Sequence, residues 1–177
     1  MRKNILIIAT LLCLIGFATA CENKITNAND YVKKDDNNLQ GEENSLVGTK
    51  WKLTAFVDVE NDTRREPDYA PDVANAVNIA IDSMYLLSFD CDSLLSGKSF
   101  SNWLDGNYSA DYNTNTLSTS IVGTKVGEAG DGDLYWNILV GEFKYFPFKL
   151  YPQALHLFYN DSKSYLEFNR IGGSDDY

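Results

Sequence analysis

The stretch GNYSADYNTNTLSTSI, residues 106–121, is typical of a β-hairpin. Residues 106–112 and 117–121 are rich in strand-forming side chains, and the polar sequence Asn-Thr-Asn-Thr at 113–116 lies between them. Asparagine and threonine favour tight turns because their short side chains hydrogen-bond to the neighbouring backbone. The stretch therefore predicts two antiparallel strands, and similar patterns on either side predict more of the same sheet.

On the N-terminal side, apolar residues recur at every second position. They are Trp51, Leu53, Ala55 and Val57, followed later by Tyr85, Leu87 and Phe89. A period of two places side chains on one face of a strand, so both runs predict strands. Residues 58–72 contain turn-forming Pro and Asp and predict a long loop, and 73–81 predict a short helix or another strand.

The C-terminal side predicts three strands, at residues 144–150, 155–159 and 165–171. Pro147 interrupts the first of them and indicates an edge strand or a bulge, because proline cannot donate to a strand ladder. Residues 123–132 contain four glycines and predict a loop between the hairpin and these strands.

Residues 133–141 are the best candidate for a helix. Two apolar pairs have the i, i+4 spacing of a helix face: Leu134 with Ile138, and Tyr135 with Leu139. Asp131 or Asp133 is expected to cap the start of this helix, and Gly141 its end.

Short strands at regular spacing with polar turns predict an antiparallel sheet that curls or closes. The expected fold class is mainly β, an α+β arrangement with one or two short helices, built on a curled antiparallel sheet or small barrel. Residues 46–177 are expected to form this single β-rich domain.

The first 21 residues indicate where the protein acts. A short cationic start is followed by the apolar run 5–17 and by Ala18-Thr19-Ala20, the pattern of a secretory signal peptide over residues 1–20. Cys21 follows at once and resembles the lipobox cysteine of bacterial lipoproteins, whose thiol receives a diacylglycerol. Two alternatives remain: Ala18 and Ala20 also fit ordinary signal peptidase, and the apolar run could be a transmembrane helix, although a span needs about 20 residues.

The polar residues 22–45 lack an apolar period and predict a flexible tether between a lipidated Cys21 and the domain. Removal of residues 1–20 would leave 13 basic against 25 acidic residues and change the formal net charge from −10 to −12. Such an acidic chain repels phosphate backbones, so nucleic acid is not an expected partner. With Cys13 removed and Cys21 acylated, Cys91 has no partner for an intramolecular disulfide.

Several segments resemble the META domain, the fold of small exported bacterial proteins such as the heat-shock protein HslJ. The resemblance covers residues 46–171. It is carried by LVGTKWKL at 46–53, GKSFSNWLDGNY at 97–108, Thr124-Lys125, the helix at 134–139 and the terminal hairpin at 155–168. The family often has a cysteine where this chain has Ser101, so the resemblance implies no cysteine-based role. The whole layout also resembles the lipocalin-like exported lipoproteins of Bacteroidetes.

Candidate catalytic and metal-binding groups are few. His156, the single histidine, is expected to be an ordinary strand residue, because no nucleophile elbow is present to partner it. Glu128, Asp131 and Asp133 offer oxygen ligands for calcium in a glycine-rich loop, but the full calcium-loop pattern is missing and helix capping explains the aspartates equally well. Asp90 and Asp92, beside Cys91, fit a turn better than a metal site or a nucleophile.

The sequence therefore predicts a lipoprotein of the cell envelope, anchored in the outer membrane by its acylated (palmitate-bearing) Cys21, with a non-enzymatic β-domain. That domain is expected to bind a protein partner or a small apolar ligand, or to support the envelope, and no cofactor or metal is expected. A small ligand would enter the mouth of the barrel, and residues 144–150 would suit strand addition. The alternative is a surface-exposed hydrolase without a recognisable catalytic motif.

Overall fold

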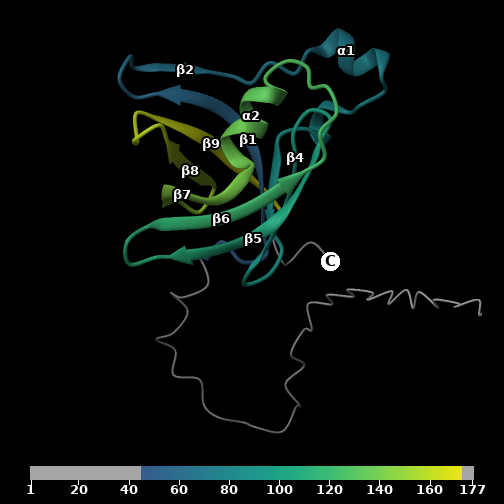
Figure 1. Cartoon of the computed structure of the whole chain (residues 1–177). Coiled ribbons are helices and arrows are strands. Elements are labelled where there is room, and N and C mark those ends of the chain that lie inside the picture. Colours follow the sequence, from purple (N-terminus) through teal and green to yellow (C-terminus); the bar gives the residue numbers. More distant parts are fainter. Residues whose placement is uncertain (1–44, 173–177) are drawn as a thin grey trace, which may run out of the picture. The chain divides into compact units, whose positions relative to one another are not determined.

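The computed structural model describes residues 45–172, and it is mainly β with two short helices (Figure 1). The expected signal peptide, Cys21 and nearly all of the tether lie outside the described residues. The strands are β1 (Thr49–Asp58), β2 (Thr63–Arg65), β3 (Leu86–Phe89), β4 (Leu94–Lys98), β5 (Trp103–Asp111), β6 (Thr116–Gly123), β7 (Gly141–Leu150), β8 (Ala154–Tyr159) and β9 (Ser164–Gly172). The helices are α1 (Pro71–Ala76), the 3-10 turn η1 (Ile81–Ser83) and α2 (Gly132–Leu139).

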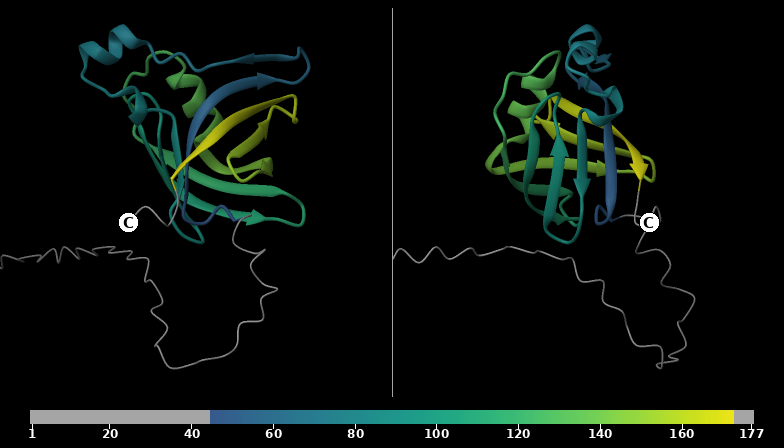
Figure 2. Two further views of the ribbon diagram at one scale, coloured as in Figure 1. Left: turned by 180° about the vertical axis from the view of Figure 1, so that it is seen from behind. Right: turned by 90° about the vertical axis from the view of Figure 1, so that its right-hand side faces the viewer.

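The sheet closes into an antiparallel barrel. Strands β3 to β9 pair in chain order, and β1 completes the ring by pairing with both β3 and β9. The small barrel expected from the alternating patterns is therefore confirmed. Lys50 pairs with Gly172, so the first and last described strands begin and end side by side at the lower end of the barrel (Figures 1 and 2).

Two irregularities in the β1–β9 pairing help the sheet to curl. The register shifts between Lys50 and Trp51, and again between Leu53 and Ala55. The second shift leaves Thr54 without a partner on β9, which is the definition of a bulge. Bulges increase local twist and bend a strand, as a closed barrel of this size needs.

Large side chains fill the inside of the barrel. The largest fully buried side chains include Trp51, Tyr85, Phe89, Phe100, Tyr135 and Phe168. The alternation along the strands explains this, because every second residue of β5, β6, β8 and β9 points inward and is buried or nearly so. The interior of the barrel is therefore a packed core.

Helix α2 closes the upper end of the barrel, where α1 and the β1–β2 hairpin also lie (Figures 1 and 2). The expected helix is confirmed, and its buried face is Tyr135 with Leu139, whereas Leu134 is 38% exposed. The Tyr135 ring contacts Tyr85 and Phe168, with centroid distances of 5.5 and 6.3 Å. The Tyr135 hydroxyl donates to the Leu86 carbonyl at 2.9 Å, which satisfies its one polar atom in the core.

The expected caps of α2 are wrong. Asp131 occupies the N-cap position, but its side chain makes no capping hydrogen bond and instead binds Arg65. Val140 ends the helix, and Gly141 begins β7 with a φ of 145°. An arginine far away in the sequence competes better for the Asp131 carboxylate than the neighbouring backbone does.

Three local expectations also need correction. The loop predicted at 58–72 contains the short strand β2 and the first two residues of α1. For 73–81 the helix alternative is the right one, since α1 extends to Ala76. Strand β4 was not expected. Pro147 does not break the strand at 144–150, because β7 runs from Gly141 to Leu150 and pairs with both β6 and β8.

Candidate functional site

A cleft lies in the barrel wall between β7 and β8, and we call it the seam cleft. Its volume is about 610 Å³, within the range of about 300–1,000 Å³ typical of small-molecule sites. The residues that line it are Asn137, Ile138, Lys144, Tyr145, Phe146, Pro147, Phe158, Tyr159, Asn160, Asp161 and Ser162. They come from the end of α2, the first part of β7, and the end of β8 with its turn into β9.

The cleft exists because β7 and β8 pair over only three residues each, Phe148–Leu150 with Leu155–Leu157. Phe148 donates its N–H to the Asn115 carbonyl at 2.8 Å, on the β6 side of β7. Successive backbone nitrogens of a strand point to opposite sides, so those of Pro147 and Lys149 face β8. Because Pro147 has no N–H to donate, the ladder to β8 ends there. Proline therefore separates the two strands without breaking β7.

The first part of β7 is poorly suited to strand addition. Thr119 pairs with Lys144 but Ile121 pairs with Gly141, so β7 has one extra residue between these pairs. Phe143, within this bulge, has a φ of 52°. A bulge on one side and a proline on the other leave only a short regular edge, which is a common way in which proteins prevent edge pairing. The expectation of strand addition at 144–150 is therefore not favoured by the geometry.

Lys144 brings a cation into the wall of the seam cleft. Its ammonium donates to the Asn137 and Ile138 carbonyls at 2.6 and 2.7 Å, where the C-terminus of α2 attracts positive charge. Burial lowers the pKa of Lys144. The cleft thus combines apolar side chains with the half-buried cation of Lys144 and with polar groups that include Asp161.

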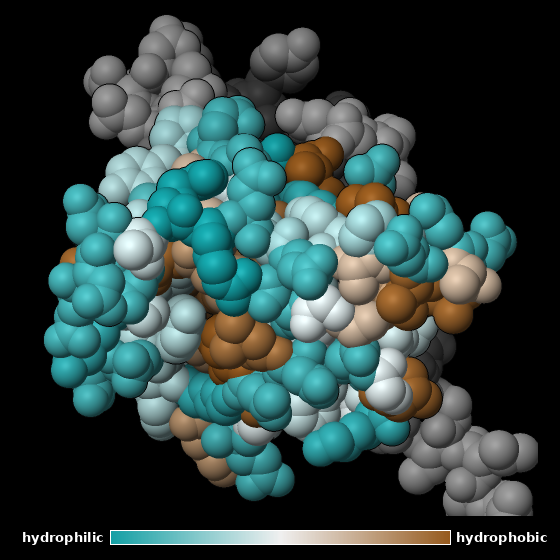
Figure 3. Space-filling view, turned by 90° about the horizontal axis from the view of Figure 1, so that it is seen from above, coloured by the Kyte–Doolittle hydropathy of each residue, from teal (hydrophilic) through white to brown (hydrophobic). Residues whose placement is uncertain are grey.

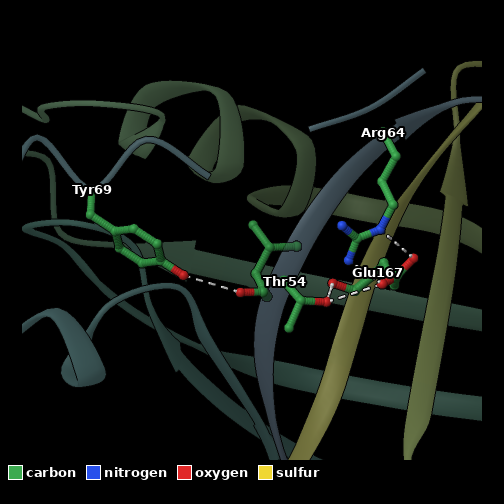
Figure 4. Close-up of polar contacts among 5 residues, drawn as sticks. Thr54, Arg64, Tyr69 and Glu167 are labelled. Carbon is green, nitrogen blue, oxygen red and sulfur yellow. Dashed lines mark hydrogen bonds and ion pairs between the residues drawn. The ribbon is translucent and has the colours of Figure 1, made fainter. Parts of the chain in front are cut away.

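A second, polar pocket of about 360 Å³ lies on the outer face of β1 and β9. Its lining residues are Thr54, Arg64, Glu66, Pro67, Tyr69 and Asn169. Figure 4 shows Arg64 and Thr54 converging on Glu167 at the edge of this pocket. Arg64 Nη2 lies 2.8 Å from Glu167 Oε1, and the bulge residue Thr54 donates to the Glu167 carbonyl at 3.1 Å. The hydrogen bond from Arg64 holds the pKa of Glu167 below its usual range.

The predicted calcium ligands do not converge. Glu128 turns toward the 99–102 turn, accepting from the Ser101 N–H at 2.8 Å and from Asn102 Nδ2 at 2.6 Å. Asp131 is bound to Arg65, and Asp133 is exposed on α2. Within residues 45–172, no three His, Cys, Asp or Glu side chains are grouped to hold a metal ion.

The structure also shows where His156, Cys91 and Ser101 lie. His156 lies on the outer face of β8, stacked on Tyr165 with a centroid distance of 4.5 Å. Burial lowers the pKa of His156, although the nearby Glu167 opposes the shift. Cys91 is a free, half-buried thiol in the turn after β3, and Ser101 contributes its backbone N–H to Glu128. Of the ring partners of His156, Phe158 is two residues away on β8, whereas Tyr151 and Tyr165 come from the preceding turn and from β9 and could not be identified from the local sequence.

No helix in residues 45–172 is both long enough and apolar enough to cross a membrane. No protein-family model matches the chain, and no curated protein matches it either. Among solved structures, the chain is similar to the crystal structure of a DUF4847 family protein from Bacteroides vulgatus ATCC 8482. The identity is 18% and the TM-score is 0.46, over 69% of this chain and 92% of that chain.

Proposed function

We propose that this chain is a lipoprotein of the cell envelope, anchored in the outer membrane through Cys21, and that its barrel is a non-enzymatic domain that binds a small apolar ligand. The observation that carries the ligand proposal is the seam cleft, since the barrel interior is filled by core side chains. Ligand sites of this size combine apolar walls with polar groups that orient the ligand, and the seam cleft has apolar side chains from α2, β7 and β8 among polar ones. The resemblance to META and lipocalin-like lipoproteins supports the same proposal.

Strand β1, the first described strand, begins at the lower end of the barrel, whereas α2, whose last residues line the seam cleft, lies in the upper part (Figure 1). The face seen from above in Figure 3 has a recess with hydrophobic residues at its bottom and hydrophilic residues around it.

Fractionation tests the anchor. Wild-type protein is expected in the membrane pellet, and Cys21→Ala is expected in the soluble fraction, because stable attachment depends on the acyl chains of that residue. If wild-type protein stays in the supernatant after the membranes are removed, the anchor proposal is wrong.

Calorimetric titration with dodecanoate tests the cleft, because this probe has an apolar chain and an anionic end that Lys144 attracts. Ile138→Ser is expected to weaken binding about fivefold or more, because it removes apolar surface from the cleft wall. The matched control, Val126→Ser, changes an exposed residue that does not line the cleft and should leave binding unchanged. Equal affinity for dodecanoate in wild type and Ile138→Ser would refute the assignment.

A further inference from the structure

Four rings form a continuous cluster on the outside of the barrel, over β8 and β9, and we call it the aromatic face. The ring pairs and their centroid distances are Tyr151–His156 5.2 Å, His156–Phe158 6.5 Å, His156–Tyr165 4.5 Å and Phe158–Tyr165 5.1 Å. The rings lie outside the core because His156, Phe158 and Tyr165 alternate with inward residues on their strands. Tyr151 is 45% exposed, so the cluster presents ring surface to solvent.

The polar pocket adjoins the aromatic face. Glu167 pairs with His156 across β8 and β9, and it follows Tyr165 by two positions on the same face of β9. Burial and the nearby Glu167 raise the pKa of the Tyr165 hydroxyl, and Arg64, which binds Glu167, lies close enough to Tyr165 to oppose this shift. The ion pair Arg64–Glu167 is therefore the border between the rings and the pocket.

The charges at this border cancel, while hydrogen-bonding groups remain exposed. Arg64 keeps half of its side chain exposed, whereas Glu167 is 19% exposed. The pocket adds the amide of Asn169, the hydroxyl of Tyr69 and the carboxylate of Glu66. Donors and acceptors thus lie together beside the ring surface. One lysine also lies on the rings, with Lys149 Nζ 5.4 Å from the centroid of Phe158.

We propose that the aromatic face and the polar pocket together bind a neutral carbohydrate. One face of a sugar ring carries C–H groups, which pack against the electron-rich faces of aromatic rings. The hydroxyl groups around the same ring both donate and accept hydrogen bonds. They can therefore accept from Arg64, donate to Glu167, and do both with the amide of Asn169. A nucleic acid or acidic polymer fits poorly, because the formal net charge of the chain is −10. This site is separate from the apolar ligand of the seam cleft, although Phe158 contacts both.

The probes are maltohexaose, cellohexaose and mannohexaose, each titrated into the folded domain while amide shifts are followed by NMR. We expect saturable binding of at least one probe, with shifts confined to β8, β9 and the pocket. The double variant Tyr151→Ala/Tyr165→Ala should weaken that binding about tenfold or more, as the loss of aromatic anchors does. The matched control is Trp103→Ala/Phe143→Ala, which removes two exposed rings from β5 and β7 and should leave binding unchanged.

A second readout separates a neutral ligand from a charged one. The affinity for the bound hexasaccharide should be the same at low and high salt, because screening affects only charged partners. Arg64→Met should weaken binding while the domain still melts cooperatively. The proposal is overturned if none of the three probes binds saturably, if both double variants lose affinity equally, or if the shifts lie in the seam cleft.

Discussion

Arg65 and Asp131 form a two-pronged ion pair, with Nη1–Oδ2 and Nη2–Oδ1 distances of 2.6 and 2.9 Å, that ties β2 to the start of α2. The same carboxylate accepts the Asp68 N–H at 2.7 Å. Burial disfavours the charged carboxylate, but the bonds from Arg65 and Asp68 outweigh it and hold the pKa of Asp131 below its usual range. Asp131 therefore joins three segments at the upper end of the barrel.

This geometry predicts an asymmetry between the two partners. Asp131→Ala should lower the free energy of unfolding by about 1–3 kcal/mol, because it also leaves the Asp68 N–H without its acceptor. Arg65→Ala should cost about 1 kcal/mol or less, since the Arg65 side chain is 51% exposed. Urea melts of both variants and the double variant measure the difference. Equal costs for the two single variants would contradict this account.

Trp51→Ala should be among the most destabilising changes in the barrel. The indole is 1% exposed, and its N–H donates to Thr49 Oγ1 at 2.7 Å. Removing a large buried side chain typically costs about 3–5 kcal/mol. The control is Val122→Ala on β6, which is 68% exposed and should change the free energy of unfolding by less than about 0.5 kcal/mol. Similar urea midpoints for the two variants would refute the strand register.

Asn102 should be as important as a core residue although it is polar. Its amide donates to the Val126 carbonyl at 3.0 Å and to Glu128, and its carbonyl accepts from Thr124 and from the Val126 N–H. Asn102→Ala is expected to cost about 1–3 kcal/mol, because several buried groups lose partners together. Asn107→Ala, exposed on β5, is the matched control, and thermal melts compare the two. A change no larger than that of the control would be inconsistent with the network.

Lys52 predicts a pH dependence of stability. Burial lowers its pKa to about 8 from 10.5, although Asp82 opposes the shift, and the amine donates to the Ile81 and Met84 carbonyls. Between these two pH values the unfolded chain binds more protons than the folded one, so this contribution to stability rises with pH. A neutral amine still has two N–H groups for the two carbonyls.

The experiment compares wild type with Lys52→Met in melts at several pH values. The stability of wild type relative to Lys52→Met should increase from pH 8 to pH 10.5 and level off above it. Subtracting the variant removes the titration of the tyrosines, which both proteins share. A flat or falling difference over this range would show that Lys52 is not desolvated in the folded protein.

Local patterns predicted many elements but not their partners. The stretch at 106–121 predicted a hairpin, and β5 and β6 pair from Leu104–Gly123 to Asp111–Thr116. Strand β2 was missed because its sequence, Thr-Arg-Arg, has no apolar alternation and all three residues are exposed. It is a strand because β1 extends beyond β3 and offers a free side, which is a property of the assembled sheet.

The candidate sites were less predictable than the strands. Pro147 predicted an edge strand or a bulge, and in the structure it ends the β7–β8 ladder, which leaves a short edge on the first part of β7 and opens the seam cleft. The aromatic face joins residues of two strands and a turn. Its polar border needs Arg64 and Glu167, which are 103 positions apart in the sequence.

By itself the sequence determined where most of the strands and the closing helix form, because a two-residue or i, i+4 apolar period decides which face of a segment can be buried. Only the tertiary structure decided that β1 meets β9 to close the barrel, that Tyr135 fills its upper end, and that β7 and β8 separate beyond Pro147. The physical reason is that periodicity is a local property of the chain. Closure of the barrel, filling of its upper end and separation of β7 from β8 depend on contacts between residues that are far apart in the sequence. The geometry of these contacts is set only when the whole sheet is assembled.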